Sequence, residues 1–219
     1  WPHLTSPLPN ESINRNDPAT ELYSTRCINY GIQKWSDLFN HRQKLLMLVL
    51  SRKIKESYNL ITEGVGELSL KELSKEETGC AVTTYLGVVF DRLVSFSNIL
   101  CRWQGGGEFL VTPFARQSLP MSWDYCELNP FSNSSGSWAN ATYAVLNFVK
   151  INAWKTNYNS YISECSANHL PYPENTFDAI LTDPPYYDSI QYSELSNFFY
   201  IWLKRCLGDV FPSSLNLSF

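Results

Sequence analysis

The chain lacks the sequence features of several protein classes. Its 219 residues include six cysteines, but no two of them form a C-x-x-C pair, so the usual ligand pattern of a structural zinc site is missing. No apolar run has the length of a membrane span, and residues 1–17 have no signal-peptide pattern. We therefore expect a protein of the cytoplasm, with no metal site and no membrane partner, whose thiols are reduced and mostly buried.

A catalytic histidine arrangement is missing as well. The sequence has three histidines, His3, His41 and His169, and no serine or cysteine has a recognisable base partner by its spacing. The sequence therefore gives no support for a hydrolase with a histidine base. The composition itself, with 44% hydrophobic residues, predicts a globular protein that can bury a sizeable core.

The patterns along the chain predict helices first and an α/β arrangement later. Apolar residues at helical spacing predict helices over about 36–61, 76–103 and 138–153. Ser36 is the expected N-cap of the first helix. The stretch 112–137 has no periodicity, and we expect a long ordered loop there.

The last part of the chain has a pattern that predicts strands as well as a helix. A short strand is predicted at 161–165, a main strand at 179–181, and a final helix at 193–207 that Gly208 ends. The expected fold class is therefore α/β, with a helix-rich N-terminal portion. Three regions are predicted: an irregular arm at 1–35, a helix-rich region with a long aromatic loop at 36–160, and an α/β region at 161–219.

The main strand ends in a carboxylate, two prolines and an aromatic ring: Asp183, Pro184, Pro185 and Tyr186. Because Pro185 has no N–H, the carbonyl of Pro184 is left as a rigidly aimed acceptor, and the Asp183 carboxylate is a second one. Together they could hold both hydrogens of an exocyclic amine while Tyr186 stacks on the ring. Ligands of open α/β sheets bind beyond the carboxyl ends of strands, which is where these residues lie. The structural alternative is a proline-rich turn after a core strand.

This motif resembles the DPPY signature of amino-methyltransferases that use S-adenosylmethionine, and the similarity covers about residues 30–210. The segments YGIQKWSDLFNHRQ, FDRLVSFSNILCRW and DSIQYSELSNFFYIWLKR are similar to one group in particular. That group is the predicted adenine-specific DNA methylases that carry a zinc ribbon and an N-terminal domain of unknown function. Residues 116–138 and 170–178 resemble the same group.

The resemblance implies a fold, a cofactor and a substrate. The chain would be part of a Rossmann-like class I methyltransferase sheet, with S-adenosyl-L-methionine as cofactor and the N6 amine of adenine in DNA as substrate. Catalysis would fall to the four residues of the motif. Contacts to the cofactor are implied for Ser166, Ala167 and Asp183, although related enzymes often have a carboxylate or amide where Ser166 and Ala167 stand.

Two features of the family are missing from this chain. One is the zinc ribbon, and the other is the strand followed by a glycine-rich turn that approaches the cofactor. The glycine cluster of the chain, at 105–107, follows a predicted helix and is interpreted as a helix stop. The chain therefore resembles the C-terminal part of a methylase, and we expect it to need a missing N-terminal half or a partner chain.

A DNA-binding surface is predicted from local charge. The net charge is −4, but residues 34–55 contain six basic residues and one acid, Asp37. The residues assigned to phosphate contacts are Arg42, Lys44, Arg52 and Lys53, with Tyr186 contacting the base. An ordinary solvated helix surface explains the same charges equally well.

The long loop leaves two interpretations open. Its aromatic residues, which include Trp123, Tyr125 and Phe131, could stack on bases, or they could form a plug that covers the sheet. The plug is the favoured interpretation. For the whole chain, the alternatives to a DNA methyltransferase are a catalytically silent DNA-binding or assembly module, and an amino-methyltransferase that acts on RNA or on a protein amide.

Overall fold

A computed structural model describes residues 6–13, 26–64, 73–116, 119–153, 161–163, 165–184 and 192–215. Five α-helices are present in these ranges: α1 (His41–Thr62), α2 (Lys75–Phe96), α3 (Trp138–Asn152), α4 (Tyr192–Leu207) and the short α5 (Pro212–Leu215). Three 3-10 helices, Arg26–Tyr30, Trp35–Leu38 and Pro113–Arg116, and two strands, β1 (Arg102–Gln104) and β2 (Phe109–Val111), complete the described elements. The predicted helices at 138–153 and 193–207 are confirmed by α3 and α4.

The first long helix begins later than predicted. Asn40 is its N-cap: the side chain of Asn40 accepts a hydrogen bond from the backbone N–H of Gln43, and the Gln43 side chain accepts one from the backbone N–H of Asn40, both at 2.9 Å. Ser36 lies in the preceding 3-10 helix, where its hydroxyl donates to Oδ1 of Asn10 at 2.9 Å. The prediction that Ser36 caps this helix is wrong because that hydroxyl is engaged elsewhere.

The second long helix ends earlier than predicted. After Phe96, the buried side chain of Asn98 donates to the carbonyls of Val94 and Ser95 at 3.1 Å, and its Oδ1 accepts from the N–H of Leu100 at 3.0 Å. These bonds satisfy the last turn of the helix locally and turn the chain away from the helix axis.

A β-hairpin follows, and it corrects the interpretation of the glycine cluster. β1 and β2 pair antiparallel, with Arg102 opposite Val111 and Gln104 opposite Phe109. Gly105, Gly106 and Gly107 form the turn between the strands, and Glu108 has a positive φ of 53°. The glycines therefore lie in the turn of a hairpin and do not stop a helix, and the positive φ of this turn belongs to Glu108.

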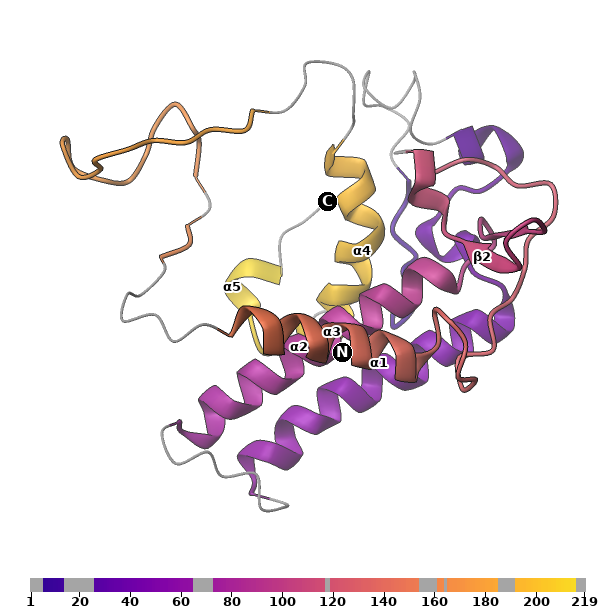
Figure 1. Cartoon of the computed structure of the whole chain (residues 1–219), viewed down its shortest axis with the longest axis horizontal. Coiled ribbons are helices and arrows are strands. Elements are labelled where there is room, and N and C mark those ends of the chain that lie inside the picture. Colours follow the sequence, from indigo (N-terminus) through magenta and orange to yellow (C-terminus); the bar gives the residue numbers. More distant parts are fainter. Residues whose placement is uncertain are drawn as a thin grey trace.

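The core lies where α4 crosses the α1–α2 hairpin (Figure 1). Its centre is a group of buried aromatic rings: Phe39 and Phe90 both meet Trp202 edge to face, with ring centroids 5.3 and 5.9 Å apart, and Phe198 stacks on Phe39 at 5.9 Å. Edge-to-face aromatic contacts add to the stabilisation from burial alone. α3 packs along the other side of α2.

Arg205 ties the N-terminal segment to α4. Its side chain is only 2% exposed, and its guanidinium donates to the carbonyls of Pro7 and Leu8 at 3.0 and 2.6 Å and to the Glu11 carboxylate at 3.0 Å. A further bond reaches the carbonyl of Ile201 at 2.7 Å, within α4. Residues 6–13 of the predicted irregular arm at 1–35 are irregular, and these contacts bind them to the core.

The two predicted strands of the last region are not present as strands. Residues 161–163 and 165–184 have neither helix nor strand, and Ile180 and Leu181 are 70% and 96% exposed. A strand requires a neighbour to pair its backbone groups, and the part of the chain that the structure describes places no such neighbour beside 179–181. The described sheet is the two-stranded hairpin, so the Rossmann-like sheet stays a prediction.

α2 is long and apolar enough to count as a membrane-span candidate by length and composition. This corrects the expectation that the chain has no such run, but it is weak evidence for a membrane protein, because the core helix of a soluble protein meets the same test. α2 packs against α1, α3 and α4 in this structure, and Val89, Phe90 and Leu93 are buried. Location in the cytoplasm stays a prediction.

Candidate functional site

The motif lies at the end of an exposed irregular segment. Asp183 and Pro184 are both exposed, while Pro185 and Tyr186 lie outside the described residues. The segment before them contains local order: Asn175 has a left-handed φ of 62°, and the Thr176 hydroxyl donates to the carbonyl of Pro173 at 2.6 Å. A turn is therefore present at Asn175, and the two acceptors, the Asp183 carboxylate and the Pro184 carbonyl, follow in an accessible stretch.

An aromatic contact connects the two parts of this segment. The ring of Tyr172 meets Phe177 edge to face with centroids 4.9 Å apart, and Tyr161 lies 6.5 Å from Tyr172 on the other side. The hydroxyls of Ser163 and Tyr172 are hydrogen-bonded at 3.0 Å. The predicted short strand thus lies beside the turn that leads to the motif, although no backbone ladder joins them among the described residues.

The residues implied for cofactor contact form a turn. The Ser166 carbonyl accepts from the N–H of His169 at 3.0 Å, and the Ser166 hydroxyl accepts from the N–H of Asn168 at 3.3 Å. Ser166, Ala167 and Asp183 are all exposed. These three residues do not enclose a nucleoside in this structure, so they do not by themselves fit S-adenosylmethionine.

The predicted basic surface is partly neutralised by acids. Arg42 forms an ion pair with Glu127, and the Glu127 bond to Nε of Arg42 measures 3.0 Å. Lys53 and Arg52 both approach Glu56, at 2.7 and 3.4 Å. The hydrogen bond from Arg42 lowers the pKa of the Glu127 carboxyl, and the bond from Lys53 lowers the pKa of Glu56.

Two of the acidic partners of this surface come from distant parts of the sequence. Glu127 belongs to the long loop, and Asp209, which pairs with Lys55, follows α4. A charge pattern between residues 34 and 55 cannot indicate these two acids, because both lie far away in the sequence. Lys44, the remaining residue assigned to phosphate contacts, is half-buried on α1.

The aromatic residues of the long loop are exposed, which contradicts the plug interpretation. Trp123 is 97% exposed and Phe131 is 80% exposed. Tyr125 and Glu127 hold the loop to the start of α1, since Nδ2 of Asn40 donates to the Tyr125 hydroxyl at 3.2 Å and to the Glu127 carboxylate at 2.6 Å. Trp123 and Phe131 therefore do not cover a sheet within the part of the chain that the structure describes. Glu127, four residues after Trp123, also binds Arg42.

Asn40 caps α1 and also binds Glu127 of the long loop, and substitutions can separate these two roles. We expect Asn40→Ala to lower the free energy of unfolding by about 1 kcal/mol, because the N-terminal N–H groups of α1 lose their side-chain acceptor. Asn40→Ser should recover most of this loss, since serine caps equally well, but it should not restore the contact to Glu127. Urea denaturation of the three proteins measures the difference. Equal losses for both variants would show that the loop contact, and not the cap, is what Asn40 supplies.

Comparison of the chain with protein-family models, with curated proteins and with solved structures found no match.

Proposed function

We propose that this chain is the catalytic-motif part of an S-adenosylmethionine-dependent DNA methyltransferase that modifies the N6 amine of adenine in the cytoplasm. The observation that carries the proposal is the motif Asp183-Pro184-Pro185-Tyr186, preceded by an apolar segment whose Ile180 and Leu181 are exposed. Exposed apolar residues in a strand-length segment are what is expected of a strand that pairs with chain lying elsewhere.

The chemistry follows from the acceptors of the motif. The Asp183 carboxylate and the Pro184 carbonyl would accept the two hydrogens of the adenine amine, and this would direct the nitrogen lone pair toward the methyl donor. Tyr186 would stack on the base. The base must be flipped out of the duplex to reach these groups, which costs a few kcal/mol, and aromatic stacking offsets part of that cost. When bound, S-adenosylmethionine supplies the methyl group.

Methyl transfer by the motif would require further protein segments that bind the cofactor. Ser166, Ala167 and Asp183 are exposed, and the glycine-rich turn at 105–107 joins β1 to β2 in an antiparallel hairpin, which differs from the strand and glycine-rich turn that approach the cofactor in the family that the chain resembles. A missing N-terminal half or a partner chain would supply that turn together with the strands beside 179–181. The direct test joins this chain to that partner and measures N6-methyladenine in duplex DNA after incubation with labelled S-adenosylmethionine. Label recovered in RNA or in protein would reassign the substrate, and no transfer to any of the three would contradict the proposal.

The isolated chain should bind S-adenosylmethionine weakly. Because the implied cofactor residues are exposed and unenclosed, we expect no saturable binding in the low micromolar range when the cofactor is titrated calorimetrically into this chain. The assembled enzyme is the matched control and should bind in that range. A low micromolar dissociation constant for the isolated chain would show that it already contains a complete cofactor site.

A DNA-binding or assembly module without catalysis is the second candidate. It is favoured by one observation: the helical part is well packed without the motif, and Trp123 of the long loop is 97% exposed. An exposed aromatic ring is suited to stacking on bases. This candidate predicts duplex binding that Trp123→Ala weakens, with no methyl transfer by the assembled protein.

A further inference from the structure

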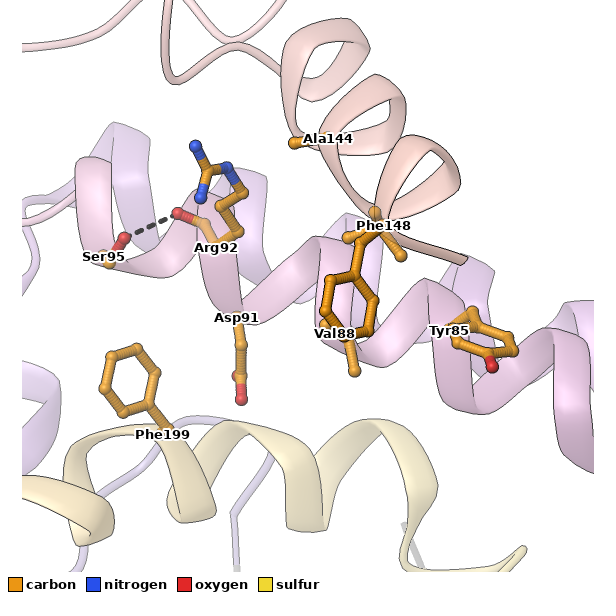
Figure 2. A pocket seen from close by; sticks show the side chains of 9 residues that line it. Tyr85, Val88, Asp91, Arg92, Ser95, Ala144, Phe148 and Phe199 are labelled. Atoms are coloured by element: carbon orange, nitrogen blue, oxygen red, sulfur yellow. Dashed lines mark hydrogen bonds between the residues drawn. The ribbon is translucent and has the colours of Figure 1, made fainter. Parts of the chain in front are cut away.

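A groove between helices lies apart from the motif. It has a volume of about 620 Å³, which is within the range of small-molecule sites. Residues of α2, α3 and α4 line it (Figure 2). Those that enter the argument are Tyr85, Val88, Asp91 and Arg92 from α2, Phe148 from α3 and Phe199 from α4.

The walls of the groove are aromatic and aliphatic. Phe148 reaches from α3 toward Val88 on α2, and Tyr85 stands one turn further along α2 (Figure 2). Phe148 is 65% exposed, and about half of the surface of Tyr85 and of Val88 is exposed. Apolar surface of this kind gains free energy when an apolar body covers it.

Asp91 is the acidic residue among those that line the groove. Its side chain points from α2 toward α4 and faces Phe199 (Figure 2), and its Oδ1 is buried with no hydrogen-bond partner among the described residues. Burial raises the pKa of the Asp91 carboxyl well above its ordinary range. A buried carboxyl oxygen without a hydrogen-bond partner costs stability, and this cost is removed when a hydrogen-bond donor or a cation binds to it.

Other acids of the bundle differ from Asp91 in this respect. Glu11, Glu127 and Asp209 each pair with an arginine or lysine. The neighbouring Arg92 extends to the opposite side of α2 from the Asp91 carboxyl (Figure 2), and its guanidinium carbon lies 6.0 Å from the centre of the Phe96 ring. Asp91 thus differs from these three acids, since no ion pair joins it to an arginine or lysine among the described residues.

We infer that the groove between α2, α3 and α4 binds a small molecule with an apolar body and a protonated amine, which pairs with Asp91. The aromatic and aliphatic walls would cover the body of the ligand. The ring of Phe199, which faces Asp91, would attract the ammonium group further, because the face of an aromatic ring is electron-rich. This site is independent of the proposed methyltransferase activity, since it uses none of the residues assigned to it.

The test compares two probes that differ in one group. We expect 4-phenylbutylamine to bind the whole chain at pH 7 at least about tenfold more tightly than the uncharged 4-phenylbutan-1-ol, because only the amine forms a charge-assisted bond with Asp91. Ligand-observed NMR titration measures both affinities. Asp91→Asn keeps the shape of the side chain and should abolish the preference for the amine while leaving the affinity for the alcohol unchanged.

A second variant tests the wall of the groove. Phe148→Ala removes an exposed ring, so it should preserve the thermal midpoint while weakening both probes by a similar factor. The inference is overturned if the parent shows no preference for the amine or binds neither probe. It is equally overturned if Asp91→Asn retains the preference, or if Phe148→Ala leaves both affinities unchanged.

Discussion

Asp183→Ala should reduce methyl transfer by the complete enzyme by about two to three orders of magnitude, which is the typical effect of losing one preorganised electrostatic contact. The substitution removes one of the two acceptors proposed for the adenine amine. The fold should be unaffected, because Asp183 is exposed in an irregular segment. DNA affinity should change little, since contacts to phosphates dominate it. The measurement is the rate of N6-methyladenine formation, with thermal midpoint and duplex affinity determined on the same proteins.

Tyr186 provides the matched controls for this prediction. Tyr186→Phe keeps the ring face and should retain most of the activity, whereas Tyr186→Ala should lose it. If Asp183→Ala stayed within a factor of a few of the parent rate, Asp183 would not be the amine acceptor. If Tyr186→Phe lost as much activity as Tyr186→Ala, the hydroxyl and not the stacking surface would be the functional group.

Arg205→Ala should lower the free energy of unfolding by about 3–5 kcal/mol, the range expected when a buried ion pair loses one partner. Arg205 is almost completely buried and holds the carbonyls of Pro7 and Leu8 together with the Glu11 carboxylate. Without the guanidinium, these acceptors lose their donors, and the N-terminal segment loses its attachment to α4. Chemical denaturation of the purified chain measures the loss.

Glu11→Gln is the control for the Arg205 prediction. It removes the charge of the partner but leaves the backbone carbonyls bound, so the expected cost is about 1 kcal/mol. Arg205→Lys should behave more like Arg205→Ala than like the parent, because an ammonium group cannot reproduce the planar fork that reaches several acceptors. A loss below 1 kcal/mol for Arg205→Ala would show that the N-terminal segment is held by its other contacts.

The helices were the most predictable part of the fold. α3 and α4 lie within a residue of their predicted bounds, because apolar spacing and a local cap define a helix within its own sequence. The ends of α1 and α2 were less predictable. Ser36 is a residue type that often caps helices, but its hydroxyl donates a hydrogen bond to Asn10. The side chain of Asn98, which lies beyond the end of α2, bonds to a carbonyl in the last turn of that helix. Such choices depend on which partners the folded chain brings near.

The structure of the charged and glycine-rich segments was also only partly predictable from the sequence. The basic stretch around α1 appeared unpaired in sequence, yet Glu127 from the loop and Asp209 from beyond α4 neutralise part of it. The glycines at 105–107 signalled a change of direction, but the choice between a helix stop and a hairpin required the pairing of Arg102 with Val111. Partners that lie far away in the sequence leave no local pattern from which the pairing could be predicted.

By itself, the sequence determined the helices of the bundle, the turn at Asn175 and the motif from Asp183 to Tyr186 on which the proposed chemistry rests, because each depends on residues close together in the chain. Only the tertiary structure decided that Arg205 would be buried against residues 6–13 and that Oδ1 of Asp91 would be buried without a hydrogen-bond partner among the described residues. It also showed the apolar residues before the motif uncovered. Burial and pairing are properties of neighbours in space, and a strand or a charge acquires its role only when those neighbours are present.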